Sequence, residues 1–221
     1  RLPAVPGTSY SAAADVCSRQ SQDYFRGRRR ESQELARLVR RERLTVLFGR
    51  PGLGKSSLLH AGLSPQLRDD LHLPVYLHID YAVATSPRQQ IWDALNKACT
   101  HHGVKAMPPE ANESLWAYFH RAGAGFWSPR RRPLLPVLMF DQFEEIFTLG
   151  QMNETSRGAA KAFIEELSDL IEDRPSELLR EQREKQRRWP GSWPYSSRDS
   201  PRHCRPSFCL STSFQVQSTS T

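Results

Sequence analysis

Short apolar runs alternate with stretches of helical periodicity along the central part of the chain. The runs LTVLF (44–48), LPVYLHID (73–80) and LLPVLMFD (134–141) are rich in strand-forming residues and predict three strands. LTVLF is apolar at nearly every position, which is typical of a strand buried on both faces. Apolar residues at helical spacing predict helices at 29–41, 55–63, 86–99, 111–123 and 157–173. Strands that alternate with helices indicate an α/β fold with a parallel sheet.

The two ends of the chain differ in character from this central part. Residues 1–19 are small and polar and predict a flexible segment. From residue 183 to residue 221 the chain is rich in Ser, Arg and Pro and has no sustained period, which predicts a disordered tail. No strand is expected after Pro175, although SFQVQSTS (213–220) alternates weakly. We therefore expect one folded domain, residues 20–182, between two flexible ends.

Charge and cysteine content narrow the function classes. The formal net charge is +7, and the tail from residue 183 holds seven Lys and Arg against two acids, 7 − 2 = +5. A basic tail can contact nucleic acid or anionic lipid, but a solvated tail is the simpler interpretation, so nucleic acid is not an expected partner. The four cysteines lack the paired spacing of a zinc site and fit a reducing cytoplasm. No window of 18 apolar residues predicts a transmembrane helix.

The segment GRPGLGKS (49–56) has the residue types of a phosphate-binding loop. It fits the Walker A pattern G-x-x-x-x-G-K-S at every fixed position and lies between a predicted strand and a predicted helix. Glycines allow successive N–H groups to turn toward a phosphate, and the helix N-terminus adds its dipole. Lys55 is expected on the β- and γ-phosphates, Ser56 on Mg²⁺, and Ser57 near the α-phosphate. The expected nucleotide-binding residues here are Gly49, Gly52, Leu53, Gly54, Lys55, Ser56 and Ser57.

The strand run LLPVLMFD and the residues QFEE that follow it have the composition of a Walker B segment. The strand delivers Asp141 to the carboxyl edge of the sheet, where ligands bind in open α/β folds. Asp141 is therefore expected to hold Mg²⁺, together with Ser56. Glu144 or Glu145 is expected to polarise the attacking water, and the sequence does not decide between them. Lys55 and one of these two acids are thus the catalytic candidates.

The base of the nucleotide is indicated only indirectly. A GTPase is expected to carry N-K-x-D, and the single Asn-Lys, at Asn96-Lys97, has no Asp after it. ATP is therefore the expected cofactor, with Mg²⁺. Two alternatives stay open: a P-loop kinase for a small molecule, with Arg130, Arg131 and Arg132 as lid arginines, and a nucleic-acid-binding protein that uses the basic tail.

Several longer segments resemble the novel STAND NTPases, which are bacterial signal-transduction ATPases of the P-loop class. The resemblance covers roughly residues 20–180, and DQFEEIFTLG (141–150) and SLWAYFHR (114–121) are its most specific parts. The segments that carry it are YFRGRRRE, GRPGLGKSSLLHAGLSPQLR, LPVYLHIDY, SLWAYFHRAGAGFWSPRRRPLLPVLMFDQFEEIFTLG and IEELSDLIEDRP. The resemblance implies a three-layer P-loop fold and a regulated ATP switch within a larger protein.

The resemblance also implies partners and further site residues. An effector domain and repeat sensor domains are expected in a full-length relative, with homo-oligomerisation on activation. Gly27 and Arg28 match the F-x-G-R element that lies near the adenine in the family, although Arg26 stands where the family tends to an apolar residue.

The end of the chain departs from the family pattern. In the family, a further strand with a polar sensor follows the Walker B segment and lies between the phosphate-loop strand and the Asp-bearing strand, in the order 5-1-4-3-2. We find no such strand in the sequence. The chain is therefore expected to be truncated after the Walker B region, with an incomplete sheet and doubtful turnover of ATP on its own.

Overall fold

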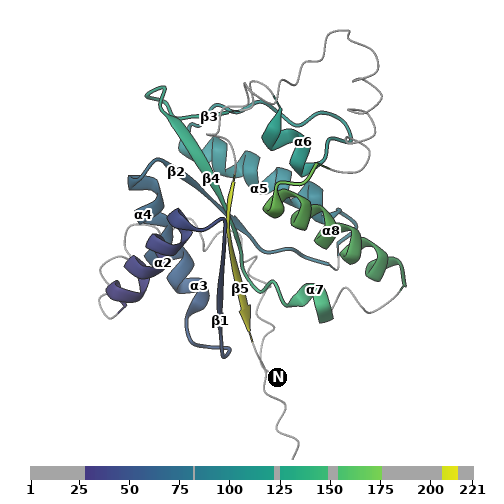
Figure 1. The fold of residues 1–221 in the computed structure, drawn as a ribbon, viewed down its shortest axis with the longest axis horizontal. Coiled ribbons are helices and arrows are strands. Elements are labelled where there is room, and N and C mark those ends of the chain that lie inside the picture. The colour runs from purple at the N-terminus through teal and green to yellow at the C-terminus, as the bar shows by residue number, and fades with distance from the viewer. Residues whose placement is uncertain (1–27, 82, 122–124, 149–153, 176–205, 214–221) are drawn as a thin grey trace, which may run out of the picture.

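The computed structural model describes residues 28–81, 83–121, 125–148, 154–175 and 206–213 (Figure 1). The strands are β1 (Leu44–Gly49), β2 (His72–Leu77), β3 (Phe126–Trp127), β4 (Pro133–Phe140) and β5 (Ser207–Ser213). The longer helices are α2 (Arg29–Arg41), α5 (Pro87–His102) and α8 (Glu154–Glu172). The shorter ones are α3 (Lys55–Ser57), the π-helical turn η1 (Leu58–Leu63), α4 (Ser64–Asp69), α6 (Leu115–His120) and α7 (Glu145–Thr148).

The sheet is mostly parallel, as the alternation of strands and helices predicted. Its strands follow the order β1-β5-β4-β2, and every pair along this path is parallel. The short strand β3 pairs with β4 in the antiparallel sense. The carboxyl ends of β1, β5, β4 and β2 therefore lie along one edge of the sheet, and their amino ends lie along the opposite edge.

Helices cover the two faces of the sheet (Figure 1). On one face, apolar residues of α2, η1 and α4 pack with Val137, Met139 and Cys209 of the central strands. On the other face, α5, α6 and α8 pack with Leu73, Val75 and Leu77 of β2 and with Phe208 of β5. The two clusters arise because successive side chains of a strand point to opposite faces of the sheet.

Most predicted helices are confirmed, with some shifted ends. Helix α2 has the predicted bounds, and α5 begins at Pro87 after the predicted cap Ser86, whose side chain accepts a hydrogen bond from the N–H of Gln89 (3.2 Å). Helix α6 is shorter than the predicted 111–123. It begins after Ser114, whose hydroxyl accepts from the N–H of Ala117 (3.2 Å) and caps the first turn.

The prediction that no strand follows Pro175 is wrong. Within the segment predicted as a disordered tail, Ser207–Ser213 forms β5 and pairs with β1 on one side and β4 on the other. It fills the position between the phosphate-loop strand and the Asp-bearing strand, where the sequence indicated a gap. One observation behind the prediction of truncation, the missing strand, therefore no longer holds. Apart from Pro206, the rest of the predicted tail lies outside the described residues, as do the predicted segment 1–19 and residues 20–27.

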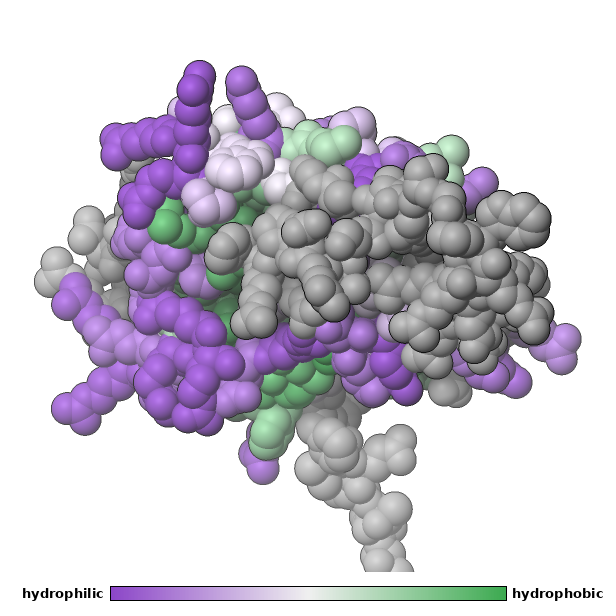
Figure 2. Space-filling view, turned by 45° about the horizontal axis from the view of Figure 1, so that its top comes forward, coloured by the Kyte–Doolittle hydropathy of each residue, from purple (hydrophilic) through white to green (hydrophobic). Residues whose placement is uncertain are grey.

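The prediction that β1 is buried on both faces is also wrong. Val46 and Phe48 are 49% and 76% exposed, and Leu44 is 37% exposed. Their alternate neighbours Thr45 and Leu47 face the side of α2 and η1 and are more buried. Among the described residues β1 is at the edge of the sheet, so no described strand lies beyond it. Hydrophobic surface is visible in Figure 2 as small areas between hydrophilic side chains.

Candidate functional site

The loop from Gly49 to Lys55 connects the carboxyl end of β1 to α3. Gly52 and Gly54 have φ angles of +78° and +72°, in the left-handed region that other residues rarely adopt. Gly54 is the N-cap of α3, and its carbonyl accepts the N–H of Leu58 (2.9 Å). Helical backbone then continues from Lys55 through η1 to Asp69. The glycine spacing of the motif is thus what lets the chain turn from a strand directly into a helix.

Lys55 lies across this loop. Its Nζ donates to the carbonyl oxygens of Gly49 (3.1 Å) and Arg50 (3.2 Å), so the ammonium group is held at the mouth of the loop. Ser56 and Ser57 follow it in the first helical turn, with Ser56 partly buried and Ser57 exposed. The predicted phosphate-binding side chains are therefore gathered at the start of one helix.

Arg28 also contacts the loop. Its Nη1 donates to the carbonyl of Leu53 (2.6 Å), and its Nε forms an ion pair with Glu31. The nearest atom to a side chain placed on Gly54 would be the same Nη1, at 3.4 Å. The guanidinium group therefore lies against the phosphate loop. Gly27, predicted to belong to the same element, lies outside the described residues.

Asp141 follows the last residue of β4 and is buried. Both of its carboxylate oxygens have donors: the Tyr76 hydroxyl donates to Oδ2 (2.5 Å) and the N–H of Gln142 donates to Oδ1 (3.1 Å). The N–H of Asp141 donates to the carbonyl of Leu77 on β2 (2.8 Å), which extends the strand pairing by one residue. Burial and the hydrogen bond to Asp141 raise the pKa of the Tyr76 phenol, so Tyr76 remains a donor at neutral pH.

Asp141 and the phosphate loop are at the same edge and face of the sheet. Gly49 pairs with Ser213 of β5, and Phe140 pairs with Leu210, so both strands end within a few residues of each other. Asp141 comes two residues after Met139, so both side chains are on the same face of the sheet, and Met139 packs there with η1 and α4. Strand β5 lies between β4, which precedes Asp141, and β1, which leads into the phosphate loop. The structure thus brings the predicted metal-binding carboxylate to the side of the sheet from which the loop helix begins.

The two acids after Asp141 differ in their surroundings. Glu144 is partly buried, and its Oε2 is enclosed without a hydrogen-bond partner among the described residues. Glu145 begins α7, and its Oε2 lies 3.9 Å from Nε2 of His78. A buried carboxylate oxygen without a partner is costly unless another molecule hydrogen-bonds to it. This distinguishes Glu144 from Glu145, which the sequence did not.

Ser211 of β5 is a candidate site residue that the sequence analysis missed. It is fully buried, its Oγ has no hydrogen-bond partner among the described residues, and its carbonyl accepts the N–H of Phe143 (2.9 Å). Ser211 comes two residues after Cys209 in β5, so its side chain is on the same face of the sheet, the face covered by α2 and η1. It lies between Asp141 and β1. The signal that could have found it is the short run SFCL followed by three hydroxyl residues.

His60 is a second missed residue. It lies in η1, and its ring is 3.8 Å from the Tyr76 ring, centroid to centroid. Burial lowers the pKa of His60, and the nearby Asp141 carboxylate opposes this in part. Single π-helical turns within helices are frequent at functional sites. His60, Tyr76 and Asp141 therefore form one contact chain from the loop helix to the acidic strand end.

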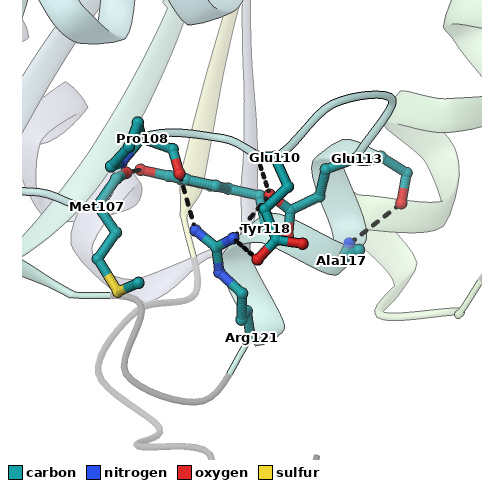
Figure 3. A network of polar contacts seen from close by, with 8 residues as sticks. Met107, Pro108, Glu110, Glu113, Ala117, Tyr118 and Arg121 are labelled. Atoms are coloured by element: carbon teal, nitrogen blue, oxygen red, sulfur yellow. Dashed lines mark hydrogen bonds and ion pairs between the residues drawn. The ribbon is translucent and has the colours of Figure 1, made fainter. Parts of the chain in front are cut away.

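The segment SLWAYFHR serves the packing of the domain, on the other face of the sheet. Arg121 is buried and donates to Glu110 (2.6 Å) and to the carbonyl of Pro108 (2.9 Å), while the Tyr118 hydroxyl donates to the carbonyl of Met107 (2.7 Å) (Figure 3). His120 lies 2.6 Å from the carboxylate of Asp173 beyond α8. These contacts fasten α6 to the loop before it and to α8.

Two further observations bear on the class of protein. No helix within the described ranges is both long and apolar enough to cross a membrane. The family model described as Novel STAND NTPase 1 matches residues 16–184. No curated protein and no solved structure gave a significant match to the chain.

Proposed function

Because the chain belongs to the novel STAND NTPase 1 family, we propose that it contains the ATP-binding switch domain of a signalling ATPase of the bacterial STAND type. The observation that carries this proposal is the loop after β1, where Gly52 and Gly54 adopt positive φ angles and Lys55 lies across the opening. Such a loop directs backbone N–H groups and one mobile cation toward a phosphate.

The proposed roles follow the P-loop class. Lys55 and the N–H groups of the loop bind the phosphates, Ser57 lies nearest the α-phosphate, and Arg28 supports the loop through Leu53. Ser56 and Asp141 would hold Mg²⁺, which neutralises charge on the phosphate oxygens when it is bound. The Oδ2 and Oδ1 of Asp141 already accept one hydrogen bond each, which favours a contact to the metal through water.

We propose Glu144 as the base that orients the attacking water. The support is its enclosed and unpartnered Oε2, because such an oxygen accepts a hydrogen bond from water at little cost. Glu145 is the second candidate. Ser211 is proposed to contact the terminal phosphate or that water, on the strength of its buried hydroxyl between β1 and Asp141.

The other predictions about the whole protein remain proposals. An effector domain, repeat sensor domains and homo-oligomerisation are proposed from family membership, and location in the cytoplasm from the cysteine content. The kinase alternative required Arg130–Arg132 to lie over the phosphate loop. These arginines precede the amino end of β4, whereas the loop follows the carboxyl end of β1, so the two are at opposite edges of the sheet. Binding of nucleic acid by the basic tail concerns residues that lie mostly outside the described ranges.

Binding of a fluorescent ATP analogue, with and without Mg²⁺, tests the proposal. We expect Lys55→Ala to weaken binding at least tenfold, and Lys161→Ala to leave it unchanged, because the Lys161 side chain is 79% exposed on α8. Glu144→Gln is expected to keep binding and to lose phosphate release, whereas Glu145→Gln keeps both. Equal binding by the wild type and by Lys55→Ala would refute the proposal.

A further inference from the structure

A pocket of about 370 Å³ lies at the edge of the sheet opposite the phosphate loop. It is lined by residues at the amino ends of β2 and β4, among them His72 and Leu134. These strands are parallel to β1, whose carboxyl end leads into the loop at Gly49. The pocket is therefore separate from the proposed nucleotide site, and the arguments for that site do not apply to it.

The charged lining of this pocket is mainly basic. Arg68 comes from the end of α4, and Arg130 and Arg132 come from the turn between β3 and β4. Among the described residues of the lining, Asp69 is the one carboxylate. Three guanidinium groups against one carboxylate leave a positive balance at any physiological pH, because arginine does not deprotonate in proteins. The pocket therefore favours an anion.

The turn between β3 and β4 holds two of these arginines in a defined backbone. Ser128 accepts the N–H of Arg132 on its Oγ (3.0 Å), donates to the carbonyl of Arg132 (2.9 Å), and accepts the N–H of Arg131 on its carbonyl (2.8 Å). Arg131 has a φ of +56° and is absent from the pocket lining, whereas Arg130 and Arg132 belong to it. Among the described residues neither Arg130 nor Arg132 forms an ion pair. Both arginines therefore line the pocket without an ion pair in the described part of the chain, and Asp69 is the carboxylate that shares the lining with them.

His72 adds an unsatisfied polar atom. Its Nδ1 is enclosed and has no hydrogen-bond partner in the described part of the chain. Burial lowers the pKa of this imidazole, and hydrogen bonds to the backbone of Asp70 and Leu67 oppose this in part. A ligand that hydrogen-bonds to Nδ1 would relieve the cost of leaving it unpaired.

The remaining wall is apolar and gives the pocket room for more than a bare anion. Leu71, Leu73, Val104 and Leu134 all line it. In the last turn of α5, the carbonyls of Cys99 and Thr100 accept the N–H groups of Val104 (2.8 Å) and Gly103 (3.2 Å). A volume of this size is within the range of small-molecule sites.

We propose that this pocket binds a small organic phosphate, with the phosphate between Arg130 and Arg132 and an apolar body against Leu73 and Val104. The forked donors of two arginines match the several oxygens of a phosphate dianion better than the two oxygens of a carboxylate. A ligand bound here contacts the amino ends of β2 and β4, the two strands whose carboxyl ends, Leu77 and Phe140, lie next to Asp141.

Calorimetric titration with phenyl phosphate tests the proposal in the full chain carrying Lys55→Ala, so that the phosphate loop does not contribute. The Arg130→Gln/Arg132→Gln double variant is expected to weaken binding at least tenfold. The matched control Arg131→Gln removes the same kind of charge from the same turn but from outside the pocket, and is expected to change binding less than twofold. Thermal unfolding of each variant checks that the turn substitutions leave the fold intact.

Three comparison titrations complete the design. Inorganic phosphate and benzoate are both expected to bind more weakly than phenyl phosphate, the first for lack of an apolar body and the second for lack of a dianion. In wild-type protein with saturating Mg-ATP, binding of phenyl phosphate is expected to persist, since the two sites are on opposite edges. Absence of binding, equal loss in the Arg131→Gln control, or displacement by Mg-ATP would each overturn the proposal.

Discussion

The hydroxyl of Tyr76 donates a 2.5 Å hydrogen bond to Oδ2 of Asp141, and this bond joins two neighbouring strands at the carboxyl edge of the sheet. Tyr76 is half-buried, and its ring contacts the ring of His60 in a tilted arrangement, with the centroids 3.8 Å apart and the planes at 38°. The N–H of Gln142 occupies the other oxygen of Asp141. The orientation of the carboxylate proposed to hold Mg²⁺ is therefore set in part by Tyr76, a residue outside the Walker motifs.

Tyr76→Phe removes this bond and leaves the ring in place. A hydrogen bond to a charged group contributes about 1.5 kcal/mol or more, so we expect the affinity for Mg-ATP to fall about tenfold. Binding of ATP in EDTA is expected to stay unchanged, because Tyr76 acts through the carboxylate and not on the phosphates. Fluorescence titrations with and without Mg²⁺ measure both affinities.

Tyr81→Phe is the matched control. Burial raises the pKa of Tyr81 as it does for Tyr76, but no hydrogen bond joins Tyr81 to Asp141. It is expected to bind Mg-ATP as the wild type does. If Tyr76→Phe lowered the affinity equally in Mg²⁺ and in EDTA, the residue would serve packing and not the orientation of Asp141.

The pattern of apolar residues predicted the fold where a strand or helix is long and periodic. Helix α2 and strand β4 match their predicted ranges within a residue because their apolar residues recur at the spacing of the element. The motif from Gly49 to Ser56 predicted the loop, since few other structures tolerate that glycine spacing. The pattern could not predict which strands distant in the sequence pair with one another, and β5 shows why.

Strand β5 was missed because it does not resemble a buried strand in isolation. Ser207, Ser211 and Ser213 interrupt its apolar run, whereas a central parallel strand is expected to be almost continuously apolar. Its backbone bonds to β1 and β4 bury Phe208 and Cys209 completely, and this tertiary pairing outweighs the weak local preference. The exposed face of β1 was missed for a related reason, because an apolar run does not reveal whether a layer covers it.

Thiol labelling tests the position of β5. In a Cys17→Ser/Cys204→Ser variant the remaining thiols are Cys99 and Cys209, both buried. Burial raises the pKa of Cys209 to about 12 and that of Cys99 to about 11, so little thiolate forms at pH 8. Both are expected to react with a disulfide reagent at least a hundredfold more slowly in native protein than in denaturant, because only an exposed thiolate can attack the disulfide of the reagent.

Cys99 on α5 serves as the internal reference for this measurement. If β5 left the sheet in solution, Cys209 would react quickly while Cys99 stayed protected, and mass spectrometry of the labelled peptides separates the two. Rapid labelling of Cys209 alone would therefore contradict the central position of β5.

Arg121→Met tests the buried network that joins the end of α6 to the loop before this helix. The side chains of Arg121 and Glu113 are 8% and 5% exposed, and the substitution leaves Glu113 buried without its cation (3.3 Å in the wild type). Loss of one partner from a buried pair costs about 3–5 kcal/mol, so the urea midpoint is expected to fall markedly. Glu113→Gln in the same background is expected to restore part of the loss.

The exposed pair Arg37–Glu34 on α2 is the control for this prediction. Its side chains are 57% and 55% exposed, so Arg37→Met is expected to leave the urea midpoint unchanged. An equal response to Arg37→Met and Arg121→Met would show that the buried network does not contribute specifically to stability.

The ring of His60 makes the stability of the domain depend on pH. Burial lowers the pKa of His60 in the folded protein, so the unfolded chain binds the proton more readily. The contribution of His60 to the free energy of unfolding is therefore expected to be fully present above about pH 6.5. Below that pH the free energy of unfolding is expected to fall, by up to about 1.4 kcal/mol per pH unit. His60→Phe keeps a ring against Tyr76 and removes the titration, so its unfolding free energy is expected to fall less between pH 7 and pH 5. Urea unfolding at both pH values measures the difference.

His72, whose pKa burial also lowers, keeps part of the pH dependence in the His60→Phe variant. An identical pH dependence in His60→Phe and the wild type would show that His60 takes up its proton equally in the folded and unfolded states.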